Sequence, residues 1–257
     1  MRIAHISDSH IVDPIENNVL SYQRLSNLDI CINDINNLSP LPDVVVHTGD
    51  ITHNGYENEF HLAFQKLKKL NVKYFLIPGN KDKSKNFLSF FNQKFNLLVK
   101  NNDYVIYSIN EFDIKFVFFD TIDPSSNSGH LNEKKINLLR EELNLYINSP
   151  VIIFMHHPPF DFILNNKNYN KFNEESAILK LQEIFINYDN ICNIFSGHIH
   201  RNVENLIEKI TCKTVAPTAL DLRFGNYPDH LLHSINYNIY DYNNNFELKT
   251  IEKWLKI

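Results

Sequence analysis

Short apolar runs alternate with amphipathic segments along most of this 257-residue chain. Four of these runs are too short for helices, and we expect each to form a buried strand: 2–6, 43–46, 74–77 and 151–155. Strands that alternate with helices favour an α/β fold in which most strands pair in parallel. This alternation is therefore the strongest constraint on the fold.

Four segments show the periodicity of an amphipathic helix. Their apolar faces are formed by Leu25, Leu28, Ile32 and Ile35, by Phe60, Ala63, Phe64 and Leu67, by Ile136, Leu139 and Leu143, and by Ile178, Leu181 and Phe185. Further strands are expected in a hairpin over 104–119 that turns near 110–113, and near 210–215, 234–240 and 246–251. Polar loops are expected at 123–130 and 161–175. These elements predict two sheets between layers of helices, in a single domain over 1–257.

Composition narrows the class of protein. Hydrophobic residues make up 43% of the chain and charged residues 21%, which allows a large core. The net charge of −5 argues against a nucleic-acid partner, because such binding needs a basic face. The three cysteines are scattered and predict reduced thiols in a cytoplasmic protein. We expect no signal peptide and no membrane insertion, and the sequence allows a homo-oligomer.

Five polar motifs follow apolar runs, so each is expected at the carboxyl end of a strand. They are Asp8-Ser9-His10, Gly49-Asp50, Gly79-Asn80, His156-His157 and Gly197-His198-Ile199-His200. Open α/β sheets bind their ligands at this edge. Carboxylate, imidazole and amide ligands suit divalent Mn, Fe, Co, Ni or Zn. The motifs therefore predict a metal centre.

The spacing of the motifs indicates two ions. In extended backbone, residues i and i+2 point the same way, so Asp8 and His10 can face one site, as can His198 and His200. These candidates outnumber the ligands that one ion needs, and Asp50, alone on its turn, is the natural bridging carboxylate. A two-metal site can hold a hydroxide between the ions and drive in-line displacement at phosphorus.

With these motifs in this order, the sequence resembles the calcineurin-like metallophosphoesterases. Within them it is most similar to the bacterial class III cyclic nucleotide phosphodiesterases and the related glycerophosphodiesterases. The resemblance spans Asp8 to about Phe224. It implies a four-layer αββα sandwich and a hydrolase that cleaves a small phosphodiester by attack of a metal-bridging hydroxide. It also implies two divalent ions (Mn, Fe, Zn or Co), one held by Asp8, His10, Asp50 and His200, the other by Asp50, Asn80, His156 and His198.

One position departs from the family pattern. The turn reads Gly79-Asn80-Lys81-Asp82, where the family has His in place of Lys81. The resemblance places residue 81 beside the phosphate, so Lys81 and Asp50 are the catalytic candidates. An unperturbed lysine, with a pKa of about 10.4, is a poorer proton donor near pH 7 than histidine, with a pKa of about 6.5. Because of this departure, an alternative function remains open: a catalytically impaired module that binds metal or phosphate.

Several other residues carry weaker expectations. His5 and His47 are expected to be structural, and His53 to be either structural or in contact with a ligand or substrate. Asp120 is expected to cap a loop or support the site, and Arg201 to be a candidate anion contact. Surface positions are expected for His61, His130, His230 and His233.

The loop after His157 is rich in aromatic residues and is expected to overhang the metals. Its aromatic residues are Phe160, Phe162, Tyr169 and Phe172. They are expected either to contact substrate or to pack the loop onto the body. A large exposed apolar patch here would instead favour a phospholipase-C-like activity on lipid head groups. Tyr169-Asn170 stands where relatives often have Met-Asp, which weakens any transfer of substrate identity.

Overall fold

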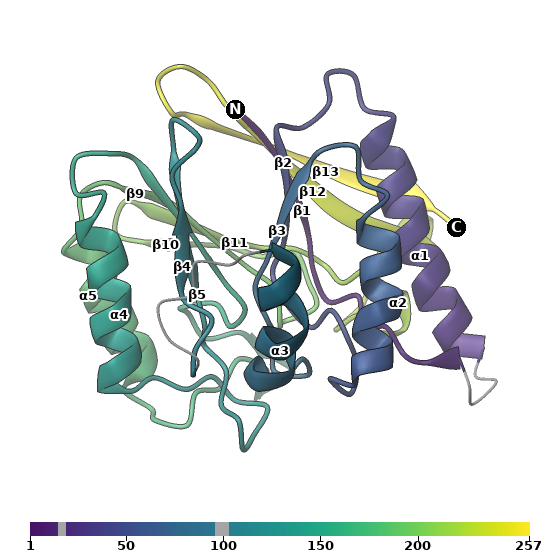
Figure 1. The fold of residues 1–257 in the computed structure, drawn as a ribbon, viewed down its shortest axis with the longest axis horizontal. Helices are drawn as coiled ribbons and strands as arrows, with labels where there is room; N and C mark the ends of the chain where they lie inside the picture. Colours follow the sequence, from purple (N-terminus) through teal and green to yellow (C-terminus); the bar gives the residue numbers. More distant parts are fainter. Residues whose placement is uncertain (15–18, 96–102) are drawn as a thin grey trace.

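The computed structural model describes residues 1–14, 19–95 and 103–257, and it contains two central sheets (Figure 1). The first sheet has the strand order β13 (Leu248–Lys256), β12 (Ser234–Tyr242), β1 (Arg2–Ile6), β2 (Val44–His47), β3 (Lys73–Leu76). Strands β1, β2 and β3 pair in parallel, and β12 is antiparallel to both β1 and β13. The N-terminal strand thus lies beside strands from the end of the chain.

The second sheet has a parallel centre and antiparallel edges. Its order is β10 (Glu204–Ile207), β11 (Ile210–Thr214), β9 (Ile191–Ser196), β6 (Val151–Met155), β5 (Lys115–Phe119), β4 (Tyr107–Ile109). Strands β5, β6, β9 and β11 pair in parallel, whereas β4 and β10 are antiparallel to their neighbours. The expected hairpin over 104–119 is therefore present as β4 and β5.

Helices cover the outer face of each sheet. On the first sheet lie α1 (Val19–Asn36), α2 (Glu57–Leu67) and α3 (Ser84–Phe95), and on the second lie α4 (Glu133–Asn144) and α5 (Ala177–Ile186) (Figure 1). The apolar faces expected for four of these helices contain buried residues, such as Leu28 and Ile32 in α1. The result is the expected four-layer αββα arrangement.

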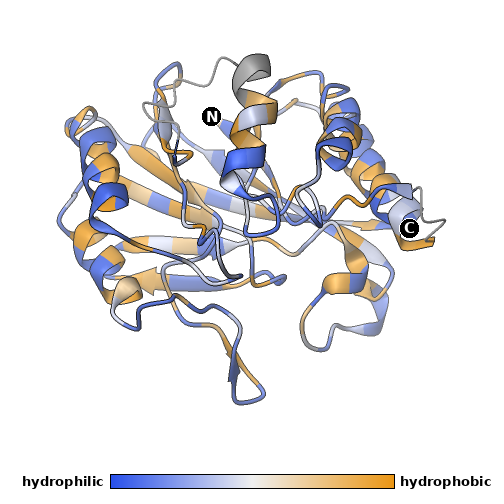
Figure 2. Cartoon of the chain, turned by 60° about the horizontal axis from the view of Figure 1, so that its bottom comes forward, coloured by the Kyte–Doolittle hydropathy of each residue, from blue (hydrophilic) through white to orange (hydrophobic). Residues whose placement is uncertain are grey.

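Aromatic residues fill the space between the two sheets. Phe195 of β9 stacks on Tyr240 of β12 with ring centroids 3.9 Å apart, and Phe118 of β5 lies 6.0 Å from Phe75 of β3. The central strands are apolar over most of their length (Figure 2). Since both faces of these strands are covered, their runs in the sequence are continuous rather than alternating.

Some elements differ from the expectations. Helix α3 and strand β10 were not predicted; β10 is a four-residue edge strand in which only Ile207 is buried, so its apolar signal is weak. The expected loop 161–175 contains a small hairpin of β7 (Ile163–Leu164) and β8 (Lys167–Asn168). The strand expected over 246–251 runs from 248 to 256.

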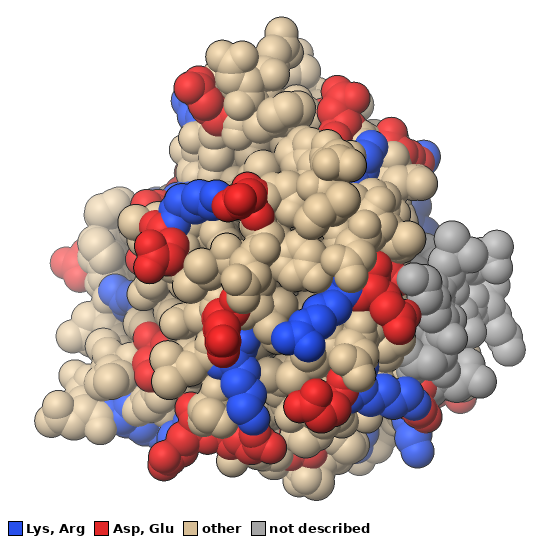
Figure 3. All heavy atoms as spheres, turned by 90° about the vertical axis from the view of Figure 1, so that its left-hand side faces the viewer, with Lys and Arg blue, Asp and Glu red and all other residues tan. Residues whose placement is uncertain are grey.

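The charges on the face that carries α4 and α5 are interspersed in sign (Figure 3). Ion pairs account for part of this pattern, as between Lys180 and Glu174, whose charged atoms lie 3.0 Å apart. Within the described ranges, none of the helices combines the length and the apolar character that crossing a bilayer requires.

Candidate metal centre

The turns after β1, β2, β6 and β9 meet at one edge of the molecule. Backbone hydrogen bonds join these turns directly: Asp8 N donates to Gly49 O at 2.9 Å, and His10 N donates to Asp50 O at 2.9 Å. Gly197 N donates to His156 O at 3.1 Å. Main-chain contacts therefore join the Asp8 motif to the Asp50 motif, and the His156 motif to the Gly197 motif.

Four side chains form what we call the Asp8 group: Asp8, His10, Asp50 and His200. Each offers a ligand atom, and these atoms all lie within 4.8 Å of one another. His200 Nε2 lies 3.2 Å from Asp8 Oδ1 and 3.2 Å from His10 Nε2, and His10 Nε2 lies 3.4 Å from Asp50 Oδ2. Among the described residues, the buried Asp8 Oδ1 has no hydrogen-bond partner. A cation would satisfy this oxygen.

A second set, the Asn80 group, consists of Asp50, Asn80, His156 and His198. Asn80 Oδ1 lies 3.1 Å from His156 Nε2 and 3.1 Å from His198 Nδ1. Asp50 Oδ1 lies 3.6 Å from His156 Nε2. The two carboxylate oxygens of Asp50 therefore face different groups, as a bridging ligand requires.

Hydrogen bonds on the outer side of the rings indicate which nitrogens carry protons. His156 Nδ1 lies 2.7 Å from the carbonyl oxygen of Thr48, and His200 Nδ1 lies 2.6 Å from that of Leu222. A carbonyl can only accept, so Nδ1 is the donor in each neutral ring, and Nε2 presents a lone pair. These lone pairs point at Asn80 Oδ1 and Asp8 Oδ1, which also only accept. Converging lone pairs fit a bound cation and are repulsive without one.

Electrostatics agree with this donor set at Asp50, His10 and His198, whereas at His200 burial lowers the pKa but the neighbouring Asp8 outweighs it, so that the pKa is raised. Burial, followed by the charge of Asp8, raises the pKa of Asp50 to about 8. Burial also lowers the pKa of His10 and of His198 well below the usual value, which keeps these imidazoles neutral and able to bind metal. The described protein groups therefore do not fully neutralise the negative charges of Asp8 and Asp50, and divalent ions would do so.

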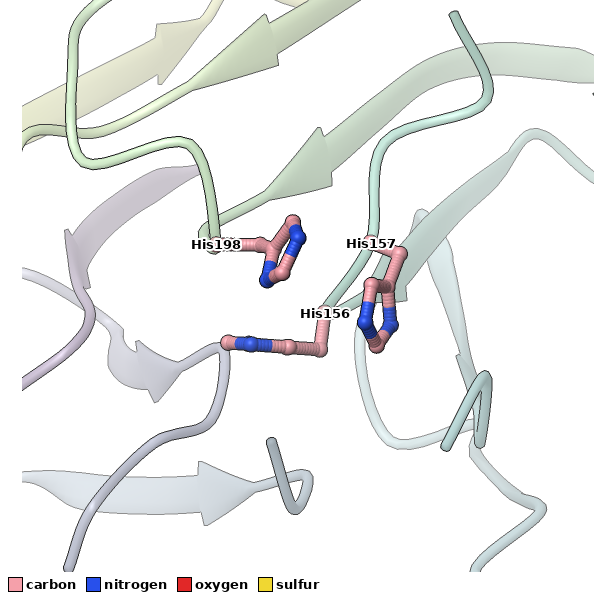
Figure 4. Close-up of side chains that lie close together, drawn as sticks. All are labelled: His156, His157 and His198. Atoms are coloured by element: carbon pink, nitrogen blue, oxygen red, sulfur yellow. The ribbon is translucent and has the colours of Figure 1, made fainter. Parts of the chain in front are cut away.

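His157 is adjacent to the Asn80 group and has another role. Figure 4 shows its ring beside those of His156 and His198, and its ring centroid lies 4.1 Å from that of His198. However, its Nδ1 lies 2.8 Å from Thr121 Oγ1 and its Nε2 lies 3.3 Å from the carbonyl oxygen of Asn127. A neutral His157 ring satisfies both contacts, because Nε2 can donate to the carbonyl and Nδ1 can accept from the hydroxyl. Nε2 of His156 instead faces Asn80 Oδ1, which only accepts, and this favours His156 over His157 as a ligand.

The backbone is strained at most of the candidate ligands. Positive φ angles occur at Asp8 (53°), His10 (44°), Asp50 (50°), His198 (67°) and His200 (50°). Such angles are uncommon outside glycine, and they cluster at functional sites when the surrounding structure holds them. Here the backbone bonds between the turns hold them. The extended backbone expected from the i and i+2 spacing is therefore wrong: Asp8 and His10 still share a group, whereas His198 and His200 belong to different groups.

Lys81 lies at the rim of the Asn80 group, where its side chain meets an unpredicted residue. Its Nζ lies 3.4 Å from Asn127 Oδ1, and the same oxygen accepts a 3.3 Å hydrogen bond from Asn80 Nδ2. Asn127 belongs to the expected loop 123–130, and the sequence holds no signal that places it here. Asp82, also in the turn, accepts hydrogen bonds from the backbone of Ile51 and Gly79 and joins two of the turns.

The weaker expectations are resolved by the contacts. His5 and His47 are fully buried, with hydrogen bonds to Thr48 and Ser9, respectively. Asp120 is a loop cap, because it accepts from the backbone N–H of Ile122. Arg201 donates to the carbonyl oxygen of Phe224, so this guanidinium is engaged by the neighbouring loop.

Two expectations about histidines have specific outcomes. His61, His230 and His233 are exposed, but His130 is half-buried, with its Nε2 3.4 Å from Asn132 Nδ2; the surface position predicted for His130 is wrong. His53 lies beside a candidate ligand, with its Nδ1 3.2 Å from His10 Nδ1.

The aromatic residues of the loop after His157 mostly pack inward. Phe160 is buried, and Phe162 and Phe172 pack against the core beneath α4 and α5. Tyr169 differs: its ring centroid lies 4.5 Å from that of Phe224, which in turn stacks on His200 at 4.8 Å. Of the four aromatic residues expected to overhang the metals, Tyr169 is therefore the one that reaches this side, through its contact with Phe224, a residue outside that expectation.

Comparisons with known proteins agree with the fold. Residues 1–202 match the family model described as calcineurin-like phosphoesterase. The chain is 32% identical over 230 residues to a probable glycerophosphodiester phosphodiesterase, GpdQ, of Arcobacter nitrofigilis, covering 87% of this chain and 82% of that protein. It is 31% identical over 205 residues to a probable cyclic nucleotide phosphodiesterase of Coxiella burnetii, covering 79% and 77%. A dimetal phosphatase from Danio rerio has the same fold, with a TM-score of 0.70, 15% identity and coverage of 100% and 96%.

Proposed function

This chain belongs to the calcineurin-like phosphoesterase family, and on that premise we propose that it is a dinuclear-metal-dependent hydrolase of small phosphodiesters. The observation that carries the proposal is the position of Asp50. Its Oδ2 faces His10 Nε2 at 3.4 Å and its Oδ1 faces His156 Nε2 at 3.6 Å. One carboxylate thus faces a ligand nitrogen from each of the two groups.

In this proposal the Asp8 group holds one ion and the Asn80 group holds the other, with Asp50 shared. Divalent Mn, Fe, Zn or Co suits a set of oxygen and nitrogen ligands without thiolates. When bound, such a pair of ions supplies Lewis acidity toward the phosphoryl group and activates water as the nucleophile. The described ligand atoms are buried except on the side of Asn80 and His198, and we place substrate entry there.

Lys81 is the proposed cation for the transition state. Its side chain is half-buried beside Asn80, and Asn127 Oδ1 accepts from both residues. This contact orients the ammonium at the rim of the Asn80 group, on the side from which substrate would enter. A preorganised charge at that point stabilises negative charge that develops on phosphoryl oxygens. The structure thus favours a working site over the impaired module.

The proposed substrate class follows the relatives. Their names specify glycerophosphodiesters and cyclic nucleotides, both of which are small diesters. The lipid-head-group alternative loses its main support, because Phe160 is buried and Phe162 and Phe172 are packed against the core. Tyr169 and Phe224 remain as the wall against which the second ester arm would lie.

The domain boundaries and the location are also proposals. We propose that residues 1–257 form one domain, because β12 pairs directly with β1 and β13 pairs with β12. The family match ends at residue 202, so these last strands are assigned by pairing alone. The three cysteines are unpaired, as expected of a protein in the reducing cytoplasm.

The experiment is hydrolysis of bis(p-nitrophenyl) phosphate and p-nitrophenyl phosphate by the full chain with Mn²⁺. We expect faster hydrolysis of the diester at equal concentration, and none after removal of metal with a chelator. A preference for the monoester would overturn the assignment to diesters, and no turnover with any of the four metals would favour the impaired module. Cyclic nucleotides, glycerophosphocholine and phospholipids would then identify the natural class.

A further inference from the structure

Each candidate histidine ligand has a second ring nitrogen on the side away from its group. For three of them, that nitrogen meets a main-chain carbonyl. His156 Nδ1 lies 2.7 Å from Thr48 O, and His200 Nδ1 lies 2.6 Å from Leu222 O. The ring of His198 is hydrogen-bonded to the backbone of Tyr169. Such outer contacts set the tautomer and the orientation of a ligating imidazole.

His10 is the exception, because its outer partner is a side chain. Its Nδ1 lies 3.2 Å from Nδ1 of His53, and the two rings meet edge to face with centroids 5.4 Å apart. The opposite nitrogen, Nε2, is the one that faces Asp50 and His200. If His10 binds metal through Nε2, its Nδ1 carries the proton, and His53 Nδ1 is the acceptor.

The backbone holds His53 in place for this contact. His53 N donates to Ile11 O at 3.0 Å, and Ile11 N donates to Ile51 O at 2.9 Å. An isolated bridge also pairs Ile11 with Thr52. Consecutive backbone hydrogen bonds thus connect the turns after β1 and β2. The last of these bonds is made by His53, whose side chain faces His10. The contact does not depend on a flexible segment.

We propose that His53 is a positioning residue for His10 that strengthens metal binding by the Asp8 group. It accepts a hydrogen bond from His10 Nδ1, and this bond aims the Nε2 lone pair at the ion. The inference rests on the metal centre proposed above. The proposal concerns one ion, because His10 belongs to the Asp8 group and not to the Asn80 group. It can be tested at this ligand because the partner of His10 is a side chain, whereas main-chain carbonyl partners cannot be removed by a side-chain substitution.

Two variants and one control test this role in the metal-free full-length protein. His53→Ala removes the acceptor, whereas His53→Asn keeps an acceptor oxygen near the position of the histidine Nδ1. His61→Ala is the control, because His61 is an exposed histidine on α2. Binding of Mn²⁺ is measured by calorimetry and by competition with a chelator, and the melting temperature of each metal-free variant is recorded.

We expect His53→Ala to weaken one of the two Mn²⁺ binding events by about 10–100-fold and to leave the other unchanged. His53→Asn should recover most of the affinity, and His61→Ala should bind as the wild type does. Wild-type affinity for both ions in His53→Ala would overturn the proposal. So would equal weakening in His53→Asn, or equal weakening of both events with a lower melting temperature. A wild-type protein that binds two ions but hydrolyses no diester would overturn the proposed activity while leaving this result readable.

Discussion

The backbone N–H of Lys81 donates a 2.7 Å hydrogen bond to Oδ1 of Asp50. The main chain of this turn therefore supports the shared carboxylate, while the Lys81 side chain reaches Asn127 at the rim. A side-chain substitution at position 81 leaves the hydrogen bond to Asp50 in place. The role of the ammonium can thus be tested without disturbing the metal ligands.

Lys81→Ala should lower kcat/KM about 10²-fold for both aryl and alkyl diesters, because a preorganised charge is lost for either leaving group. Lys81→His should raise the rate on an alkyl diester more than on bis(p-nitrophenyl) phosphate. Only the alkoxide leaving group needs a proton, and general-acid help is worth roughly 10²–10⁴-fold. The measurement is kcat/KM for the three proteins on both substrates at fixed Mn²⁺. Unchanged rates in Lys81→Ala would remove this residue from the mechanism.

Asp50→Ala should abolish retention of both ions, since Asp50 is shared by the Asp8 group and the Asn80 group. Asn80→Ala should empty mainly one position, because the contacts of Asn80 Oδ1 are to His156 and His198 of the Asn80 group, each at 3.1 Å. Metal analysis after gel filtration gives the stoichiometry of each variant. Two ions retained by Asp50→Ala would show that the bridge is assigned incorrectly.

Gly197→Ala should destabilise the protein by about 1–3 kcal/mol through overpacking. A Cβ at residue 197 would overlap Ser7 Oγ and lie 2.5 Å from Asp8 Oδ2, so both side chains must shift. Thermal unfolding measures the loss. Ser196→Ala is the neighbouring control, because the buried Ser196 Oγ has no hydrogen-bond partner among the described residues, and we expect little change. Equal melting temperatures for Gly197→Ala and wild type would contradict the predicted clash.

The stability of the loop that carries Asn127 should depend on pH through Asp123. Burial raises the pKa of Asp123, but hydrogen bonds from Ser125, Asn173 and Ser126 outweigh it and lower the pKa to about 2. The folded pKa is below the unfolded value of about 3.9, so the stabilisation is present above about pH 4 and disappears as the pH falls through 2.

Asp123→Asn tests this dependence in the metal-free protein. The unfolding free energy of the variant should be lower than that of the wild type at pH 5, and the difference should shrink as the pH approaches 2. Urea unfolding at several pH values between 2 and 5 measures it. A difference that stays constant over this range would show that the Asp123 charge does not stabilise the loop.

Tyr169→Ala and Phe224→Ala should raise KM about tenfold for 3′,5′-cyclic AMP, because stacking of a base on an aromatic ring contributes about 1–3 kcal/mol. The effect on glycerophosphocholine should be smaller, because Lys167 Nζ already lies 4.7 Å from the Tyr169 ring centroid and disfavours a second cation. Ile163→Ala is the control, because Ile163 is an exposed residue of the β7–β8 hairpin that precedes Tyr169. Equal effects on the KM of both substrates would show that Tyr169 and Phe224 do not favour a substrate with a planar base.

The pattern of residue types predicts the layers of the fold and most residues of the candidate centre. Apolar runs such as 151–155 are buried on both faces, and polar motifs that follow such strands must fall at the same edge of a sheet. That regularity is local, so residues such as Asp8, Asp50 and His198 can be predicted from one chain. The short edge strand β10 could not, because an edge strand buries few side chains and leaves a weak apolar pattern.

The atoms that meet in the candidate centre follow from contacts between distant segments, which the residue pattern does not contain. Adjacent histidines 156 and 157 are equivalent in the sequence, yet the ring of His157 is taken up by Thr121 and Asn127. The contact of His53 with His10 depends on two turns joined across 43 residues of chain. Such contacts follow from backbone hydrogen bonds between distant segments and from positive φ angles, which no local pattern of residue types encodes.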